Sequence, residues 1–450
     1  MQTTTQVESQ SNGKVQQLQT QAAPPQRWSL IRRLALLFSV VYFPLYTLWV
    51  PVHFIPIPPI PQLFDKYQVL RRVIVVWVGE GLLHLQVRTG VVEVGNGSKD
   101  TMYNWVELLC YVVLAAAFAV IWSVLDRKRP NYERLQQWFL LYMRLVLGTM
   151  LIQYGVAKIF PAQFPAPTLS TLVEPYGDSS PMHLLWTFMG ASPIYTFFAG
   201  AVEVLGGALL FIPRTRLLGA LISLGAMGNV LMLNLGYDVA VKIGSITMVC
   251  MAIILIVPDL RRLFNFFLFN QRVDPAPEPP LFQSKRLNQA ALVLQLVFCF
   301  VLVAHNLYAD RHSSQAFLDY HVKAPLYGIW SVDEFSLDGQ VRPPLLTDEQ
   351  RWQRIIVDSN DTVWVQSMNG QPVEFRLRVD PQRKSLRMAR SVDSAWRADF
   401  AYENPQTDQL LLTGQLDGHP VTVTLRRMDE SKFLLINRGF HWVNEFSLNR

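Results

Sequence analysis

Long apolar runs dominate the first two thirds of the chain. Seven of them approach the roughly 20 apolar residues that a helix needs to cross the hydrocarbon core of a bilayer. They cover residues 34–55, 105–125, 137–160, 193–212, 217–236, 239–258 and 288–309. An eighth stretch, Val73–Leu85, is shorter and carries Glu80 and His84, so we expect it to lie at the membrane interface. The pattern predicts an α-helical polytopic membrane protein with about seven spans.

After Tyr308 the pattern changes to period two. Alternating apolar and polar residues occur at 361–366, 373–379 and 421–425, and turn signals such as Asn369-Gly370 separate such runs. Eight or so strands joined by short turns are typical of an up-and-down antiparallel barrel, which here would be a lipocalin-like outer domain.

Two details of this region are similar to lipocalin-like barrels. Gly328-Ile-Trp330 opens the first expected strand, and we expect Arg438 to stack over that early tryptophan. A barrel of this size either holds a small ligand or is filled by its own side chains, and the sequence leaves both open.

These patterns divide the chain into five segments. They are a disordered tail (1–30), N-terminal spans with an outer loop (31–136), a four-helix membrane core (137–270), a linker with the last span (271–309) and the barrel-like domain (310–450).

The charge distribution predicts an orientation. Half of the residues are hydrophobic and 16% are charged, and the net charge of +6 comes from basic residues that flank the apolar runs. Loop 161–183 has no Lys or Arg, so the positive-inside rule places the N-terminus in the cytoplasm and the barrel outside the cell membrane. We therefore expect a lipid bilayer as partner and no nucleic acid.

The three cysteines and eight histidines form no paired motif, so we expect neither a disulfide framework nor a metal site.

Four ionisable residues lie in or at the ends of the apolar runs: Arg144, Lys158, Glu203 and Lys242. A charge at membrane depth costs roughly 2.5–3.5 kcal/mol on insertion scales, so it persists where it is paired or used. A rise of about 1.5 Å per residue places Arg144 and Glu203 at matching depth, which predicts an ion pair. The same estimate places Lys158 and Lys242 near the outer surface.

Glycines accompany these charges. Gly148 and Gly155 share a helix face with Arg144 and Lys158, and small residues on such a face let a second helix approach closely. Three further polar residues can extend a pocket from neighbouring spans: Asn229, Asn234 and Asp238. Two interpretations stay open, namely an ion pair that locks two helices and a polar pocket for a quinone head group, a proton or an anionic ligand.

Several motifs in order resemble the DoxX-like membrane proteins. They are Arg144-Leu-Val-Leu-Gly148, Tyr154-Gly-Val-Ala-Lys158, Glu203-Val-Leu-Gly-Gly and Tyr237-Asp-Val-Ala-Val-Lys242. The resemblance covers residues 137–262 and implies a four-helix core. Leu184–Gly190 and Trp122–Arg129 look like a longer subgroup with extra spans and a C-terminal β domain. Some DoxX-like proteins are subunits of thiosulfate:quinone oxidoreductase or partners in membrane redox assemblies, so the resemblance implies a quinone cofactor and a redox partner subunit.

Two alternatives remain at this stage. The chain can be a non-enzymatic membrane scaffold or lipophilic-ligand binder, with the barrel as its recognition module. It can also be a vitamin-K-carboxylase-like membrane enzyme, because Tyr154-Gly-x-x-Lys158 looks like a stretch of that group and a buried lysine can serve as a base.

Overall fold

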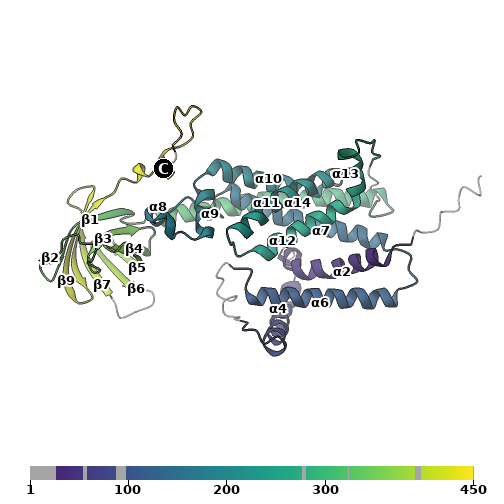
Figure 1. Cartoon of the computed structure of the whole chain (residues 1–450), viewed down its shortest axis with the longest axis horizontal. Coiled ribbons are helices and arrows are strands. Elements are labelled where there is room, and N and C mark those ends of the chain that lie inside the picture. The colour runs from purple at the N-terminus through teal and green to yellow at the C-terminus, as the bar shows by residue number, and fades with distance from the viewer. Residues whose placement is uncertain are drawn as a thin grey trace, which may run out of the picture. The chain divides into compact units, whose positions relative to one another are not determined.

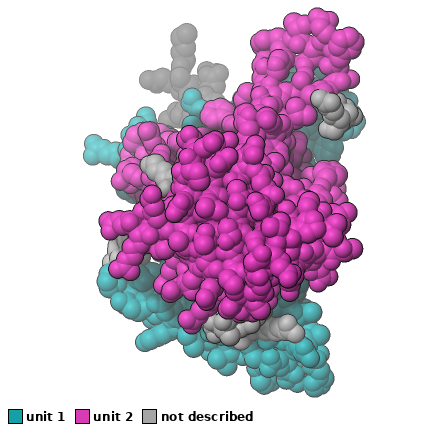
Figure 2. All heavy atoms as spheres, turned by 90° about the vertical axis from the view of Figure 1, so that its left-hand side faces the viewer, with its two compact units in different colours: residues 1–150, 210–227, 240–293 teal, residues 151–209, 228–239, 294–450 magenta. Residues whose placement is uncertain are grey.

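The computed structural model describes residues 27–53, 58–87, 98–275, 280–322, 324–390 and 397–448. Most of the expected polar tail, residues 1–26, lies outside these ranges. The chain forms two compact units. Unit 1 comprises residues 1–150, 210–227 and 240–293, and unit 2 comprises residues 151–209, 228–239 and 294–450 (Figure 2).

Among the described residues, seven helical segments are long and apolar enough to cross a membrane, which confirms the seven predicted runs. They are α2 (Leu30–Thr47), α6 (Met102–Leu125), α7 (Glu133–Ile159), α10 (Pro193–Phe211), α11 with its preceding turn (Pro213–Gly236), α12 with α13 (Lys242–Phe267) and most of α14 (Lys285–Val322). Figure 1 shows them as long helices, with α2 beside α6.

Hydrogen bonds fix the ends of the first helices in unit 1. The side chain of Ser29 accepts from Arg32 N at the start of α2, and Thr101 and Asn104 form a capping box at the start of α6. Arg33 donates from Nη2 to the carbonyl oxygen of Asp126 at the end of α6, over 2.7 Å. This contact ties the start of α2 to the end of α6.

The shorter elements of unit 1 lie between these helices. They are α3 (Trp49–His53), α4 (Ile60–Val76), the π-helical turn η1 (Trp77–Leu82) and α13 (Leu260–Phe267), which follows α12 (Lys242–Ile256) after the turn Val257–Asp259. The stretch expected at the membrane interface is helical for most of its length, as the end of α4 and η1. Val75 packs there with Val87, Tyr103 and Val106. Its place relative to a bilayer stays a prediction.

Unit 2 begins in the last turns of α7 and continues through α8 (Leu169–Val173), the turn Tyr176–Asp178 and α9 (Pro181–Gly190) into α10. Helix α14 runs to Val322 without interruption. The predicted last span, residues 288–309, is therefore the first part of a longer helix, and the first strand begins at Gly328 as the sequence predicts. Polar residues enter the sequence there, but they lie on a continuing helix.

Nine strands form one antiparallel sheet that closes into a barrel. They are β1 (Gly328–Leu337), β2 (Gln340–Val341), β3 (Trp352–Val357), β4 (Thr362–Ser367), β5 (Pro372–Asp380), β6 (Ser385–Arg390), β7 (Arg397–Glu403), β8 (Gln409–Leu416) and β9 (His419–Arg427). From β3 to β9 each strand pairs with the next, and β1 pairs with both β3 and β9. The closed barrel thus has eight strands with β2 as a short addition to β1, which confirms the predicted up-and-down architecture.

Large side chains fill the barrel interior. Along β7 residues alternate between exposed and buried, so Phe400 points inward with its neighbours two positions away. Its ring lies 5.9 Å from that of Trp352, in an edge-to-face arrangement, and Trp352 also packs against Phe335. The described interior residues form one continuous apolar core, so the self-filled alternative fits this barrel.

Arg438 does not occupy the predicted position over Trp330. It follows the short helix α15 (Leu434–Asn437) and donates to Asn444 Oδ1 over 2.6 Å. The arginine opposite Trp330 in the ladder is Arg427 of β9, and a Cβ on Gly328 would lie 3.0 Å from its Nε. The expectation for Arg438 is wrong because β9 ends before residue 438.

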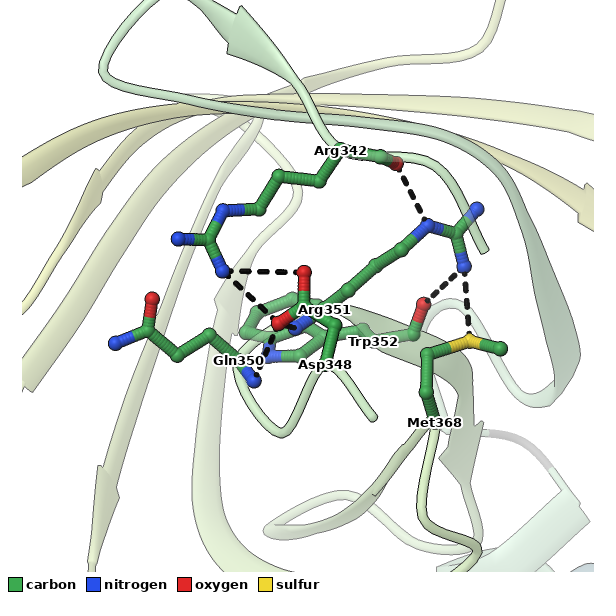
Figure 3. A network of polar contacts seen from close by, with 6 residues as sticks. All are labelled: Arg342, Asp348, Gln350, Arg351, Trp352 and Met368. Atoms are coloured by element: carbon green, nitrogen blue, oxygen red, sulfur yellow. Dashed lines mark hydrogen bonds and ion pairs between the residues drawn. The ribbon is translucent and has the colours of Figure 1, made fainter. Parts of the chain in front are cut away.

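A network of polar contacts lies at one end of the barrel, between β2 and β3 (Figure 3). The buried Arg351 donates from Nε to the carbonyl oxygen of Arg342 over 3.0 Å, and from Nη1 to that of Trp352 over 3.1 Å. Arg342 in turn forms an ion pair of 2.9 Å with Asp348. Burial lowers the pKa of the Arg351 guanidinium, but an arginine stays charged at neutral pH, so carbonyl oxygens solvate a buried cation here.

The other end of the barrel docks on α8. The buried carboxylate of Asp358, in the β3–β4 turn, accepts hydrogen bonds from Leu169 N and Ser170 N over 2.8 and 3.1 Å. These N–H groups have no intrahelical acceptor at the start of a helix. Leu169 also packs against Ile329 and Ile356, so the barrel and the α7–α10 connection share an apolar contact.

Candidate functional site

A buried ion pair joins α7 and α10 within unit 2. Lys158 Nζ lies 2.8 Å from Glu203 Oε2, and the two side chains are 8% and 3% exposed. Lys158 lies in the last turn of α7 and Glu203 in the middle of α10. Of the four charges that the sequence singled out, Lys158 and Glu203 form an ion pair with each other.

Two glycines make this contact geometrically possible. Gly155 and Gly200 lie one turn before Lys158 and Glu203, respectively, and their backbones touch. A Cβ on Gly155 would lie 2.6 Å from the carbonyl oxygen of Gly200, closer than any real Cβ contact. The helices therefore approach to backbone distance at this point, and a short carboxylate can meet the ammonium group.

Tyr154 borders the pair. Its ring centroid lies 5.9 Å from Lys158 Nζ, within range of a cation–π interaction, and 45% of the residue is exposed. Because Lys158 and Glu203 are almost fully buried, Tyr154 is the part of this group that reaches the surface of the helices.

The pair has spare hydrogen-bonding capacity. An ammonium group carries three N–H donors and a carboxylate has two acceptor oxygens. Among the described residues, the side chains of Lys158 and Glu203 share one hydrogen bond and make no other. A bound molecule can accept from the ammonium group and donate to the carboxylate while the ion pair stays in place.

Arg144 has a different role from the predicted one. It donates from Nε to the carbonyl oxygen of Leu210 over 2.9 Å, while Glu203 pairs with Lys158. Leu210 lies in the last turn of α10, where carbonyl oxygens lack intrahelical donors and favour a positive charge. The predicted Arg144–Glu203 pair is wrong, and Lys158 is buried against Glu203, whereas its depth in a bilayer stays a prediction.

Lys242 lies at the start of α12, in unit 1. The Asp100 carboxylate accepts hydrogen bonds from Lys242 N over 2.6 Å and Ile243 N over 3.0 Å, and lies 3.9 Å from Lys242 Nζ. Asp100 thus caps α12 from a distant part of the sequence. Sequence reasoning missed it because no local pattern links residues so far apart.

The three further polar residues predicted to extend the pocket differ in burial. Asn229 and Asp238 are exposed, and Asp238 has a positive φ of 50° just after α11 ends at Gly236. Asn234 is buried, and its Nδ2 has no hydrogen-bond partner among the described residues. Within the described chain, neither Asn229 nor Asn234 bonds to the Lys158–Glu203 pair.

A second charged cluster was missed by the sequence reasoning. Glu107 on α6 forms a 2.7 Å ion pair with Arg71 on α4 and accepts from the hydroxyl group of Tyr111 over 3.0 Å. The Tyr111 hydroxyl also lies 3.2 Å from that of Tyr67. Glu107 lies near the start of the apolar run 105–125, and an acid at such a position was a signal for a charged cluster. Its partner Arg71 lies in a segment that the sequence does not predict as a membrane span.

One curated relative is similar to part of this chain. It is the Bacillus subtilis (strain 168) protein described as "Uncharacterized protein YwoB", which is 34% identical over 124 residues. The aligned part is 28% of this chain and 79% of the relative. No protein-family model matches the chain, and no solved structure matches it significantly. With this identity over most of the relative's length, the chain belongs to the same family as the B. subtilis protein YwoB.

Proposed function

We propose that this chain is a multi-pass membrane protein that binds a quinone head group at the Lys158–Glu203 pair, as a subunit of a membrane redox complex. The observation that carries the proposal is the buried ion pair with unused donors and an unused acceptor among apolar helices. The resemblance to DoxX-like proteins supports the redox setting. The N-terminus would lie in the cytoplasm and the barrel outside the cell membrane.

The chemistry of the pair suits both forms of a quinone. A quinone carbonyl oxygen can accept a hydrogen bond from Lys158 Nζ, and a quinol hydroxyl can donate to Glu203. The apolar surroundings strengthen both interactions, since few water molecules compete. Electrons would pass between the quinone and the redox partner subunit that the resemblance to DoxX-like proteins implies.

Titration with a short-chain quinone tests this site. The full chain in nanodiscs is titrated while its tryptophan fluorescence is recorded, for the wild type and for Glu203→Gln and Lys158→Gln. Loss of a hydrogen bond to a charged group costs about 1.5–3 kcal/mol, so affinity for the quinone should fall roughly 10- to 100-fold in Lys158→Gln. Affinity for the corresponding quinol, titrated in the same way, should fall by the same factor in Glu203→Gln. Thr196→Val is the matched control, because it removes a buried hydroxyl from the same helix α10 and leaves the pair intact. Wild-type affinity in folded variants of the pair would refute the proposal.

A membrane scaffold is the second candidate, favoured by the direct contact of α7 and α10 at the pair. The double variant K158E/E203K separates the two functions. This variant restores an ion pair between α7 and α10, and hence the thermal stability that is expected if the pair holds the two helices together. It also exchanges the positions of the hydrogen-bond donor and acceptor. Restored stability with quinone binding still lost supports the binding site. A wild type that binds no quinone, together with restored stability, supports the scaffold.

A further inference from the structure

The C-terminal segment, residues 434–448, exposes an unusual density of apolar side chains. Its large apolar residues and their exposed fractions are Leu434 (43%), Leu435 (51%), Ile436 (47%), Phe440 (67%), Trp442 (91%), Val443 (73%), Phe446 (88%) and Leu448 (40%). Surface apolar residues are normal when scattered singly, but a contiguous group marks a surface that a membrane or another molecule covers.

The segment starts at the barrel end that docks on α8. Met428, directly after β9, donates from its backbone N to Ile329 O over 2.8 Å. Phe433 packs on the apolar cluster of Leu169, Ile329 and Ile356. Because α8 begins ten residues after the end of α7, this end of the barrel is the one connected to the helices that would cross the bilayer.

Other exposed aromatic residues lie in the connection between α7 and α10 and in the first turns of α10. They are Tyr176, Phe188, Tyr195, Phe197 and Phe198, with exposed fractions between 39% and 79%. Tyrosine and tryptophan concentrate at the level of lipid head groups, where their apolar rings and polar groups are both satisfied, and neighbouring phenylalanines add apolar surface there. The segment therefore leaves the barrel beside a predicted interfacial belt.

The segment is long enough to reach that level. Helix α14 has 38 residues. At about 1.5 Å per residue it is roughly 57 Å long, against a hydrocarbon thickness of about 30 Å. At most about 27 Å of it can project on the side of the barrel. The four helical residues of α15 add about 6 Å and the nine residues from Arg438 to Phe446 up to about 30 Å when extended, which together exceed that distance.

We propose that the C-terminal segment is an interfacial anchor, which inserts Phe440, Trp442 and Phe446 into the bilayer that the long helices cross. A lipid surface fits better than a protein partner, because beyond the four-residue helix α15 the segment offers no helix or strand face for docking. Arg438 and Glu445 balance in charge, so the anchor needs no anionic lipid. The inference rests on the membrane insertion assumed in the proposed function.

Spin labels test the anchor in the full chain. The three native cysteines, Cys110, Cys250 and Cys299, are first replaced by alanine, and single cysteines are then placed at three positions. These are Trp442→Cys, the restored Cys250 on an exposed face of α12, and Gln371→Cys in the β4–β5 turn at the other end of the barrel. Each protein is reconstituted singly in zwitterionic nanodiscs, and relaxation by molecular oxygen and by a water-soluble nickel chelate is compared.

The expected result is preferential relaxation by oxygen at position 442, as at 250, and by nickel at 371. Nickel accessibility at 442 equal to that at 371, with 250 still in lipid, overturns the anchor and leaves the membrane insertion intact. Loss of relaxation by both reagents at 442 indicates burial against protein and also overturns it. Nickel accessibility at 250 would instead refute the membrane insertion itself.

Discussion

The substitution Gly155→Ala tests the contact that brings Lys158 and Glu203 together. The new Cβ would lie 2.6 Å from Gly200 O, 2.8 Å from Val204 Cγ2 and 2.9 Å from Val204 N. Two of these three atoms belong to the backbone, so no side-chain rotation relieves the clash. An ordinary contact starts at 3.4 Å, so α7 and α10 must separate by about 0.8 Å.

The separation acts on the ion pair as well, because Lys158 and Glu203 lie one turn further along the same two faces. A shift of about 0.8 Å lengthens the 2.8 Å contact to about 3.6 Å, beyond the range of a hydrogen bond. Overpacking of this kind typically costs about 1–3 kcal/mol, and the weakened pair adds to that cost. We expect Gly155→Ala to lower both the free energy of unfolding and the affinity for a quinone.

The assay is thermal unfolding of the detergent-purified full chain, followed by quinone titration of the folded protein. Gly228→Ala on α11 is the matched control, since nothing lies within 4 Å of the position that its Cβ would take. Alanine favours a helix over glycine by about 0.8–1.0 kcal/mol, so this control should be neutral or slightly stabilising. A Gly155→Ala protein that melts and binds like the wild type would refute the close crossing of α7 and α10.

Two further predictions concern the barrel. Asp358→Ala removes the acceptor of the hydrogen bonds from Leu169 N and Ser170 N. Each hydrogen bond to a charged group contributes about 1.5–3 kcal/mol, so hydrogen exchange at both amides should accelerate. Amides in β7 should stay protected. Wild-type exchange at the two amides would contradict this docking contact. At Asp361, the hydrogen bond from the Tyr320 hydroxyl lowers the pKa of the carboxyl group, and Thr362 and Ser359 act in the same direction. A carboxyl group with a lowered pKa stabilises the fold above its ordinary pKa of about 4 and loses that contribution as the pH falls through the folded-state value. Asp361→Asn should therefore flatten the fall of the unfolding midpoint below about pH 4, and an unchanged acid profile would contradict the contact.

The sequence predicted the elements better than their ends. Length and hydropathy identified the seven long helices, because each must bury or present an apolar surface along its whole length. The end of α14 was missed, since polar residues after Tyr308 suit an exposed helix as well as a loop. Alternation predicted the strands, but the same rule misplaced the arginine near Trp330, because the end of β9 depends on its pairing with β1.

The sequence also identified the buried charges without identifying their partners. Depth along a helix axis matched Arg144 to Glu203, but pairing depends on helix rotation and on where two backbones touch. Gly155 and Gly200 decide that point, and they bring Lys158 to Glu203. Arg144 is used at the end of α10 instead, where Leu210 presents its carbonyl oxygen.

The sequence by itself thus determined which segments are helices and strands and which charges must be accommodated among apolar residues, because periodicity and desolvation are local properties. Tertiary structure alone decided the closure of β1 on β9, the cap that Asp100 places on α12 and the joining of Lys158 to Glu203. Each of these unites residues that are distant in the chain, and their meeting depends on packing that no local pattern encodes.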